Sequence, residues 1–416
     1  MQTIAPLYSL RDTCRLCGSH HLANVLPLPA TPAGDHYVPQ DKLGETQPTF
    51  PLDVLLCTDC GQSQLAAVVQ PGFLYGSYTY RTSVSLGLAQ HFQDYADDLV
   101  ARLSLPEGVL VVDIGSNDGT FLNGFTRHGM RLLGVDPASI VVQEAIARGI
   151  PTINRFFSPE TAREILASHG SARLITANNV FANIDDLESF VAGVALLLDE
   201  KGAFVFETGY WLDLVNNRVI DNIYHEHLSY FSVAPLARFL ARHGLVLADV
   251  VHSSSKGGSI RGIVRRTESG ATPSGKVEAM LSAERAFGLH HPASYKPLES
   301  LLSDLRNKFG QLLAECQLHE KTLAGFGASV GVTTLLYALG LNDKISFLVD
   351  DNPLKQGLFS PGGHIPVLAP HALDDKKPDY VILFPWRYGD TILAKHADFT
   401  AHGGKFVFPL PAFGMR

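Results

Sequence analysis

The chain has 416 residues, more than one hydrophobic core usually organises, so we expect two or three domains. Its composition, 46% hydrophobic and 18% charged, is that of a globular protein and excludes extensive disorder, while a formal net charge of −8 gives no basic footprint for nucleic acid. No apolar run approaches the roughly 20 residues of a membrane span and the first residues lack a secretory pattern, so we expect a cytoplasmic protein without nucleic-acid or membrane partners.

Two Cys-x-x-Cys pairs lie in the first expected domain, residues 1–70: Cys14 with Cys17 and Cys57 with Cys60, each pair followed by a glycine. Thiolates spaced by two residues on a tight turn can bind one tetrahedral zinc ion, and a small segment with few apolar residues is stabilised by such a metal. Four cysteine ligands leave no open position for water, so we predict structural zinc. Unrelated thiol pairs and a redox pair are the alternatives. The odd total of five cysteines does not suit a secreted disulfide framework.

A helical pattern over residues 84–104 opens the second expected domain, residues 71–268, and strand and helix patterns then alternate. The expected strands are residues 109–114, 131–135, 174–177, 203–207, 245–252 and 258–265. Alternation of this kind predicts a mostly parallel sheet that is covered by helices on both faces.

A glycine loop, Asp113-Ile-Gly-Ser-Asn-Asp-Gly119, ends the first of these strands and begins a helix. Its glycines let the backbone approach a ligand, and the helix start offers free N–H groups. A dinucleotide fingerprint would begin with glycine. The acid Asp113 instead disfavours a doubly negative ligand and suits a cationic, amino-bearing one such as S-adenosylmethionine.

Other residues at the carboxyl edge of the expected sheet complete this site. Asp136 ends the second strand, where a ribose-binding carboxylate belongs, and two asparagines follow the third strand. The assembly resembles class I S-adenosylmethionine-dependent methyltransferases; a nicotinamide-binding domain or a vestigial fold is the alternative. The residues expected to bind the methyl donor are Asp113, Gly115, Asn117, Gly119, Asp136, Asn178 and Asn179.

The third expected domain, residues 269–416, follows a polar stretch and begins with a long amphipathic helix over 296–317. Further strands are expected at 322–325, 345–349, 380–384 and 405–408. A second glycine loop, 325–331, suits contact with a nucleotide sugar, nicotinamide binding or turn packing alone. The expected fold is therefore α/β, with an N-terminal zinc-binding module, a central class I methyltransferase (Rossmann-like) domain and a second, C-terminal Rossmann-like domain.

The stretch Tyr224-His225-Glu226-His227 is the densest cluster of titratable side chains and lies just beyond the 203–207 strand. The histidines are two apart, which excludes the His-Glu-x-x-His pattern of zinc proteases. A structural hydrogen-bond network is one explanation. Its position beyond the carboxyl edge of the sheet favours catalysis.

Taken together, these motifs resemble the S-adenosylmethionine-dependent sugar C-methyltransferases of deoxysugar biosynthesis, the C-3′ type that builds branched sugars. The resemblance also includes segments 77–83, 256–261 and 351–357. It implies a three-domain enzyme with structural zinc, S-adenosylmethionine in the middle domain and a nucleotide-diphosphate-linked 4-keto-sugar held towards the C-terminal domain. Two features depart from the family pattern: Asn183 stands in place of a histidine, and the second glycine loop lacks a lysine.

The resemblance implies that His227 removes the proton from the carbon to be methylated, with His225 as the rival base. Glu226 would orient or polarise the imidazole, while Tyr224 and Tyr78 would donate to the enolate oxygen. If the segment is extended, the two histidines point the same way and Glu226 points opposite. The residues expected to bind substrate are Tyr80, Asn183, His225, Lys256, Arg261, Gly325, Gly327, Asp351 and Asn352.

Three other functions remain open: methylation of another nucleotide-linked sugar or small molecule, an NAD-type oxidoreductase that uses the second glycine loop, and a non-catalytic binding protein. The sequence does not fix the oligomeric state, and a monomer is compatible with it.

Overall fold

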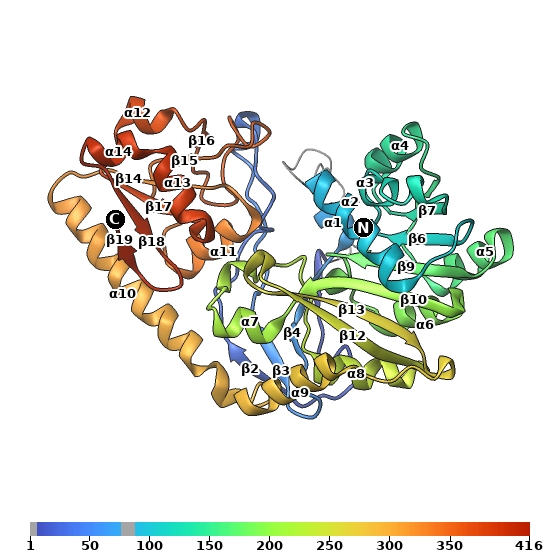
Figure 1. Cartoon of the computed structure of the whole chain (residues 1–416). Helices are drawn as coiled ribbons and strands as arrows, with labels where there is room; N and C mark the ends of the chain where they lie inside the picture. The colour runs from blue at the N-terminus through green and yellow to red at the C-terminus, as the bar shows by residue number, and fades with distance from the viewer. Residues whose placement is uncertain (1–5, 76–87) are drawn as a thin grey trace, which may run out of the picture.

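The computed structural model describes residues 6–75 and 88–416. Two α/β lobes lie side by side, one formed by the middle of the chain and one by its C-terminal part, and the N-terminal strands contact both (Figure 1). Among the described residues, no helix combines the length and apolar character needed to cross a bilayer.

The middle lobe is built on a seven-stranded sheet in the order β12-β13-β10-β9-β6-β7-β8. Only β13 runs antiparallel to its neighbours. The strands are β6 (Leu110–Ile114), β7 (Arg131–Val135), β8 (Thr152–Ile153), β9 (Ala172–Asn178), β10 (Leu198–Gly209), β12 (Leu245–Ser253) and β13 (Ser259–Arg266). All six expected strands of this lobe are confirmed, and only the two-residue strand β8 was too short to be predicted.

Helices cover both faces of this sheet because successive strand residues point to opposite sides. Val111 and Val205 pack under α2 (Leu88–Leu103) and α3 (Thr120–Asn123). Val112 and Phe206 pack on the other face, in one core with α5 (Pro159–His169), α6 (Leu187–Leu197) and α8 (Val233–Arg242). The remaining helices of the lobe are α4 (Ser139–Ala147), α7 (Trp211–Asn216) and α9 (Gly275–Phe287).

The C-terminal lobe has a six-stranded sheet in the order β16-β15-β14-β17-β18-β19, parallel except for β19. Its strands are β14 (Leu323–Phe326), β15 (Leu348–Val349), β16 (Val367–Leu368), β17 (Tyr380–Leu383), β18 (Lys405–Phe408) and β19 (Gly414–Met415). Its helices are α11 (Val330–Ala338), α12 (Ala372–Lys376), α13 (Gly389–Lys395) and α14 (Ala397–Ala401). The prediction of a second doubly wound unit is confirmed, although β15 begins three residues later than expected.

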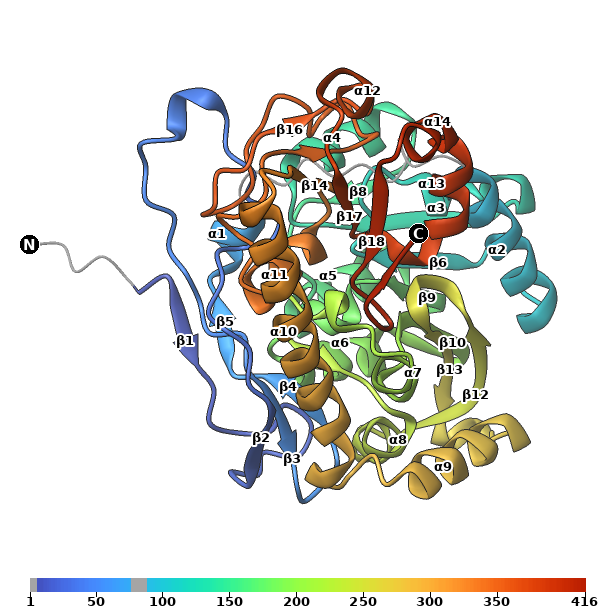
Figure 2. The same ribbon diagram turned by 90° about the vertical axis from the view of Figure 1, so that its left-hand side faces the viewer.

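The long helix α10 (Lys296–Leu318) joins the lobes and runs across the front of the molecule in Figure 2. It buries a stripe of apolar residues, from Leu298 to Cys316, in one core with the N-terminal strands and the C-terminal sheet. Helix α9, which follows the expected boundary at residue 268, packs on α8 and β12. Its Glu284 accepts the backbone N–H groups of Val233 and Ala234 at the start of α8. The boundary at 268 itself stays a prediction.

The N-terminal segment forms a four-stranded antiparallel sheet in the order β11-β4-β3-β2. The strands are β2 (Leu22–Leu26), β3 (Val54–Cys57), β4 (Ser63–Leu65) and β11 (Ser229–Tyr230). A shorter sheet pairs β1 (Tyr8–Leu10) with β5 (Ala67–Val69), and α1 (Pro71–Tyr75) follows. Strand β11 comes from the segment directly after the Tyr224–His227 stretch, so the N-terminal sheet is completed by the middle of the chain.

The four predicted metal ligands converge at one end of this sheet. Their sulfur atoms lie within 4.8 Å of one another, with 3.5 Å between those of Cys14 and Cys60 and 3.6 Å between those of Cys17 and Cys57. Tetrahedral zinc with bonds of about 2.3 Å needs sulfur atoms about 3.8 Å apart, which this cluster fits. Gly18 and Gly61 close the two turns with positive φ angles of 75° and 82°. The site is a closed, structural zinc centre.

We predict one zinc ion per chain. Chelation should loosen residues 14–65 first, because metal binding at such a site contributes directly to folding, and should then reach β11. Metal analysis and hydrogen exchange measure the two effects. Cys17→Ser should lose zinc, whereas the matched change Cys316→Ser, in α10, should retain it. Freshly purified protein without zinc would refute the assignment.

Candidate functional site

The first glycine loop connects β6 to α3 and turns through left-handed backbone at three positions. Gly115, Asn117 and Gly119 have φ angles of 74°, 50° and 76°. A Cβ atom at Gly115 would lie 2.9 Å from the Val180 side chain, so only glycine fits beside the segment that follows β9. The loop therefore lies against the end of β9, as the sequence predicted for a shared edge.

Asp136 holds this loop in place from the end of β7. Its two carboxylate oxygens accept the backbone N–H groups of Asn117, at 2.9 Å, and Ala138, at 2.8 Å. Burial raises the pKa of this carboxyl group. Each carboxylate oxygen has a further lone pair, so the group can still accept ligand hydroxyls.

Two more acids lie under the loop. Asp113 accepts a 2.6 Å hydrogen bond from Thr176, and burial raises its pKa to about 7. Asp118 is fully buried and pairs with Arg148 at 3.2 Å. Sequence reasoning missed this pair, in which a buried carboxylate bonds an arginine that is about half exposed.

The two asparagines after β9 have different surroundings. Asn178 accepts a 3.0 Å hydrogen bond from the Tyr95 hydroxyl of α2. Asn179 has a φ angle of 55° and accepts a 3.0 Å bond from Lys256, in the turn between β12 and β13. Lys256, predicted to bind substrate, thus reaches the edge of the predicted donor site.

His227 is held as a neutral imidazole with one nitrogen unprotonated. Its Nδ1 lies 3.1 Å from the carbonyl oxygen of Asn222 and its Nε2 lies 2.9 Å from the Tyr224 hydroxyl. A carbonyl only accepts, so Nδ1 carries the proton and Nε2 accepts from Tyr224. Burial lowers the pKa of His227 to about 4. The imidazole is therefore an unprotonated base throughout the neutral range.

The segment that carries the two histidines is not extended. Residues 224–227 form a turn, in which the His227 N–H donates to the Tyr224 carbonyl at 3.0 Å. The two histidines consequently have separate partners. His225 is fully buried, its Nε2 donates to the Phe50 carbonyl at 3.2 Å, and burial lowers its pKa to about 4. This side chain packs into the N-terminal module, and its predicted contact with substrate stays a prediction.

The Asn222 carbonyl occupies the Nδ1 of the His227 imidazole, and a role for Glu226 in orienting or polarising that imidazole stays a prediction. Burial raises the pKa of Glu226 to about 7, and one of its buried oxygens has no hydrogen-bond partner among the described residues. Burial, and then the nearby Glu226 carboxylate, raise the pKa of Tyr75. The Tyr75 hydroxyl lies 3.4 Å from the amide nitrogen of Asn183. Glu226 thus faces the end of α1 and the segment after β9.

Arg261 has several partners within the protein. Its guanidinium contacts Glu207 at 3.1 Å and Asp98 at 3.5 Å, and lies over the Tyr95 ring at 3.2 Å from the centroid. Its buried Nε has no hydrogen-bond partner among the described residues, and its predicted contact with substrate stays a prediction.

The second glycine loop is packed tightly. A Cβ atom at Gly325 would meet Phe384 at 2.7 Å, and one at Gly327 would meet Pro385 at 2.8 Å. Gly331 lies under the backbone of Asp221, whose carbonyl oxygen is 2.0 Å from the position of a Cβ atom. Turn packing therefore accounts for these glycines, and contact with a nucleotide sugar stays a prediction.

Two predicted substrate residues follow β15 at the surface. Asp351 pairs with Lys395 at 2.6 Å, and Asn352 accepts the Leu354 N–H in a local turn. The preceding residue, Asp350, accepts the Ala328 N–H at 2.5 Å. Tyr78 and Tyr80 lie outside the described residues.

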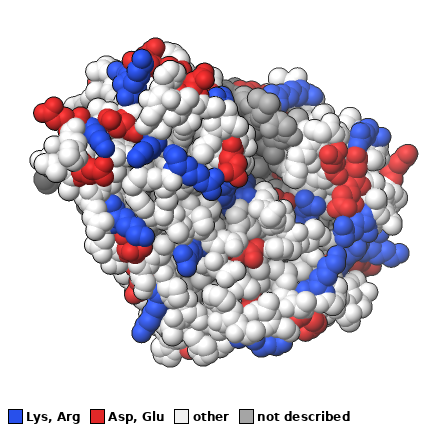
Figure 3. Space-filling model, turned by 60° about the vertical axis from the view of Figure 1, so that its left-hand side comes forward, with Lys and Arg blue, Asp and Glu red and all other residues white. Residues whose placement is uncertain are grey.

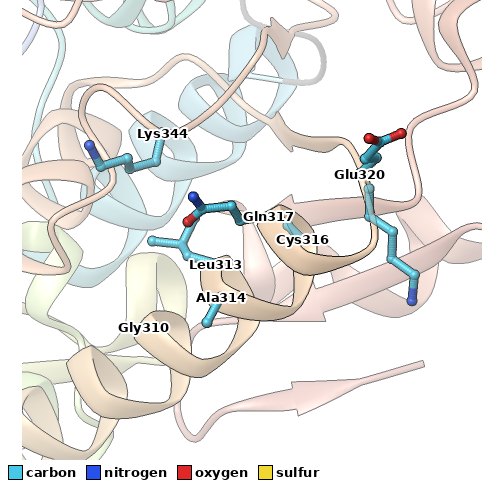
Figure 4. A pocket seen from close by; sticks show the side chains of 8 residues that line it. Gly310, Leu313, Ala314, Cys316, Gln317, Glu320 and Lys344 are labelled. Carbon is cyan, nitrogen blue, oxygen red and sulfur yellow. The ribbon is translucent and has the colours of Figure 1, made fainter.

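An open hollow of about 680 Å³ lies beside the C-terminal end of α10 (Figure 4). Its lining includes Leu313, Gln317 and Lys344, and none of the predicted site residues. On the face shown in Figure 3, basic and acidic side chains are interspersed. The hollow is thus separate from the residues predicted to bind donor and substrate.

Family models match almost the whole chain. Their descriptions are "Putative zinc binding domain" for residues 14–75, "Methyltransferase domain" for residues 88–250 and "C-methyltransferase C-terminal domain" for residues 254–411. The C-methyltransferase NovU of Streptomyces niveus is 34% identical over 96% of this chain and 96% of its own length. A ubiquinone biosynthesis O-methyltransferase of Methylobacterium sp. (strain 4-46) is 26% identical over 43% of this chain and 73% of its own.

Among solved structures, an S-adenosylmethionine-dependent methyltransferase from Clostridium acetobutylicum ATCC 824 overlaps 47% of this chain and 96% of its own, at 15% identity and a TM-score of 0.35. The match to NovU extends over 401 residues, so it includes most of all three parts of the chain. This chain therefore belongs to the C-methyltransferase family, as a class I enzyme that uses S-adenosylmethionine and carries a zinc-binding N-terminal domain.

Proposed function

We propose that the enzyme moves a methyl group from S-adenosylmethionine to the carbon next to the ketone of a nucleotide-linked 4-keto-deoxysugar, at C-3′. The three divisions expected from the sequence would then hold zinc (1–70), methyl donor (71–268) and nucleotide sugar (269–416). The family match to a C-methyltransferase along the whole chain supports methylation at carbon. The observation that carries the mechanism is the unprotonated Nε2 of His227, held by Asn222 and Tyr224.

Methylation at carbon requires a carbanion equivalent, and a carbon next to a ketone supplies one as its enolate. In this mechanism Nε2 of His227 takes the proton from that carbon, whose electrons form the enolate. The carbon then attacks the methyl group, the S–CH3 bond breaks and S-adenosylhomocysteine leaves. A base and a donor to the developing oxyanion are both needed. The Tyr224 hydroxyl, which donates to Nε2 before substrate binds, would turn to the enolate oxygen, with Tyr78 as a second donor.

The predicted donor contacts form a row along the glycine loop. Asp136 would accept the ribose hydroxyls, and the loop from Gly115 to Gly119 would lie beside the donor. The ketone-bearing ring would lie between the His227 turn and Asn183. Asparagine cannot take up a proton, so Asn183 would only hydrogen-bond the sugar. One Asn183 oxygen is buried without a partner among the described residues, which suits such a bond.

The substrate is tested by mass spectrometry of reactions between the enzyme, S-adenosylmethionine and a panel of nucleotide 4-keto-sugars. A 4-ketone has two neighbouring carbons, so NMR of the product must distinguish C-3′ from C-5′. We expect one methyl group at C-3′. Methylation at oxygen, or no transfer to any nucleotide sugar, would contradict the proposal.

His227→Asn should keep binding of donor and sugar but lose methyl transfer by about 10²-fold or more, because the proton acceptor is gone. Exchange of the α-proton with heavy water, measured by NMR without methyl donor, should be lost in parallel. His225→Asn tests the rival base and should keep both activities if His225 only packs against Phe50. A His227 variant that still exchanges and methylates would remove this residue from the mechanism.

A pH dependence follows from Glu226, whose pKa lies near 7. If the carboxylate accepts a bond from the sugar, kcat/KM should fall as pH drops through about 7, and this limb should vanish in Glu226→Gln. His227, with its pKa near 4, cannot produce that limb.

The pKa of Glu226 is raised in the native protein, so ionisation of Glu226 costs stability as pH rises towards 7. Glu226→Gln should therefore raise the unfolding temperature at pH 8, measured by calorimetry; an unchanged pH profile would exclude this role.

Asp136→Asn should weaken donor binding by roughly ten- to a hundredfold, since hydrogen bonds to a carboxylate contribute about 1.5–3 kcal/mol each. Calorimetry with S-adenosylhomocysteine measures the effect. The control is Asp350→Asn, because Asp350 accepts loop N–H groups in the same way in the other lobe. If the two variants bound the donor with equal affinity, the ribose would not lie at Asp136.

A further inference from the structure

Three polar residues lie in one row across neighbouring strands of the middle sheet. In the strand register Glu207 of β10 is opposite Arg261 of β13 on one side and opposite Asn178 of β9 on the other. Residues that are opposite one another in a sheet share a face. The row is therefore covered by the helix on that face, α2.

Helix α2 contributes two side chains to this row. Asp98 lies 3.5 Å from the Arg261 guanidinium, and the Tyr95 ring lies beneath that guanidinium at 3.2 Å. Glu207 and Arg261 are largely buried, with side-chain exposures of 15% and 14%. A planar guanidinium that stacks on a ring while it bonds two carboxylates fixes the position of that ring.

The Tyr95 hydroxyl in turn fixes the Asn178 amide. It donates to Oδ1 of Asn178 at 3.0 Å, and burial raises the pKa of Tyr95, so it remains a donor at neutral pH. The amide nitrogen of Asn178 is buried without a hydrogen-bond partner among the described residues. A buried N–H group without a partner is destabilising, so this group is available to bind an acceptor from outside the protein.

The order of the strands indicates which acceptor the amide nitrogen of Asn178 meets. Strand β6 and its glycine loop lie between β7, which carries Asp136, and β9, which carries Asn178. A donor whose ribose lies at Asp136 and whose sulfur lies over the loop directs its amino-acid end towards β9. That end carries a carboxylate, which accepts hydrogen bonds.

We propose that Tyr95 and Arg261 are positioning residues that orient the Asn178 amide to bind the amino-acid carboxylate of the methyl donor. Arg261 holds the Tyr95 ring, Tyr95 holds Oδ1, and Nδ2 is left to bind the ligand. The inference depends on S-adenosylmethionine as donor and not on the identity of the sugar, so its failure would leave the proposed function standing.

The test compares two ligands that differ at the amino-acid end. S-Adenosylhomocysteine has the carboxylate, whereas 5′-methylthioadenosine keeps the nucleoside and the thioether but lacks it. Tyr95→Phe removes only the hydroxyl. It should weaken binding of S-adenosylhomocysteine about three- to tenfold, as expected for one hydrogen bond, and leave methylthioadenosine affinity unchanged. Isothermal calorimetry measures both dissociation constants.

Two further variants complete the experiment. Tyr380→Phe is the matched control: it removes a hydroxyl that bonds Glu315 and Lys321 in the C-terminal lobe, and should change neither affinity. Arg261→Lys keeps the charge but cannot stack and bridge two carboxylates, so it should reproduce the selective loss. Equal weakening of both ligands in Tyr95→Phe, or no weakening of either, would overturn the proposal.

Discussion

The antiparallel pairing of β11 with β4 determines where the candidate active site lies. Ser229 and Tyr230 pair with Gln64 and Ser63, which follow the second cysteine pair by only a few residues. The turn that carries His227 immediately precedes β11, so the zinc-bound sheet and the reacting region share a backbone. Arg15, which is buried beside Cys14, also connects the two segments, because its guanidinium donates to the carbonyls of Leu65 and Leu228. A structural metal thereby supports a site to which it contributes no ligand.

In both doubly wound lobes, backbone N–H groups of the glycine loop find their acceptor in the same way. In each, an aspartate at the end of the second strand accepts one N–H from the preceding glycine loop and one from the residue two positions ahead. Asp136 does this with Asn117 and Ala138, and Asp350 with Ala328 and Asn352. Charged acceptors satisfy loop donors that would otherwise be buried without partners. The surroundings differ, because Gly115 of the first loop lies against Val180 at the end of β9, whereas Gly331 of the second is covered by Asp221.

Much of the fold could be predicted from periodicity and spacing. Buried parallel strands such as β6 and β9 are rich in apolar residues, and the cysteine pairs have metal-ligand spacing. The candidate site was harder to predict because several of its partners are not marked by residue type. The acceptor that orients His227 is a backbone carbonyl, that of Asn222, and the turn at 224–227 depends on a local hydrogen bond. The protein partners of Arg261 were equally hard to predict, because sequence alone does not show that Glu207 is opposite it in the sheet.

The close approach of Gly331 to Asp221 has a consequence for building hybrid enzymes. The Asp221 carbonyl lies over the first turn of α11, and Thr334 of that helix donates to the Ile223 carbonyl at 2.5 Å. Asn222, between Asp221 and Ile223, is the residue whose carbonyl accepts a hydrogen bond from the His227 imidazole. The C-terminal lobe therefore supports the turn that carries His227 through the backbone of residues 221–223. A chimera that exchanges this lobe with a relative would have to carry residues 220–223 and α11 together, because the two surfaces are shaped to each other.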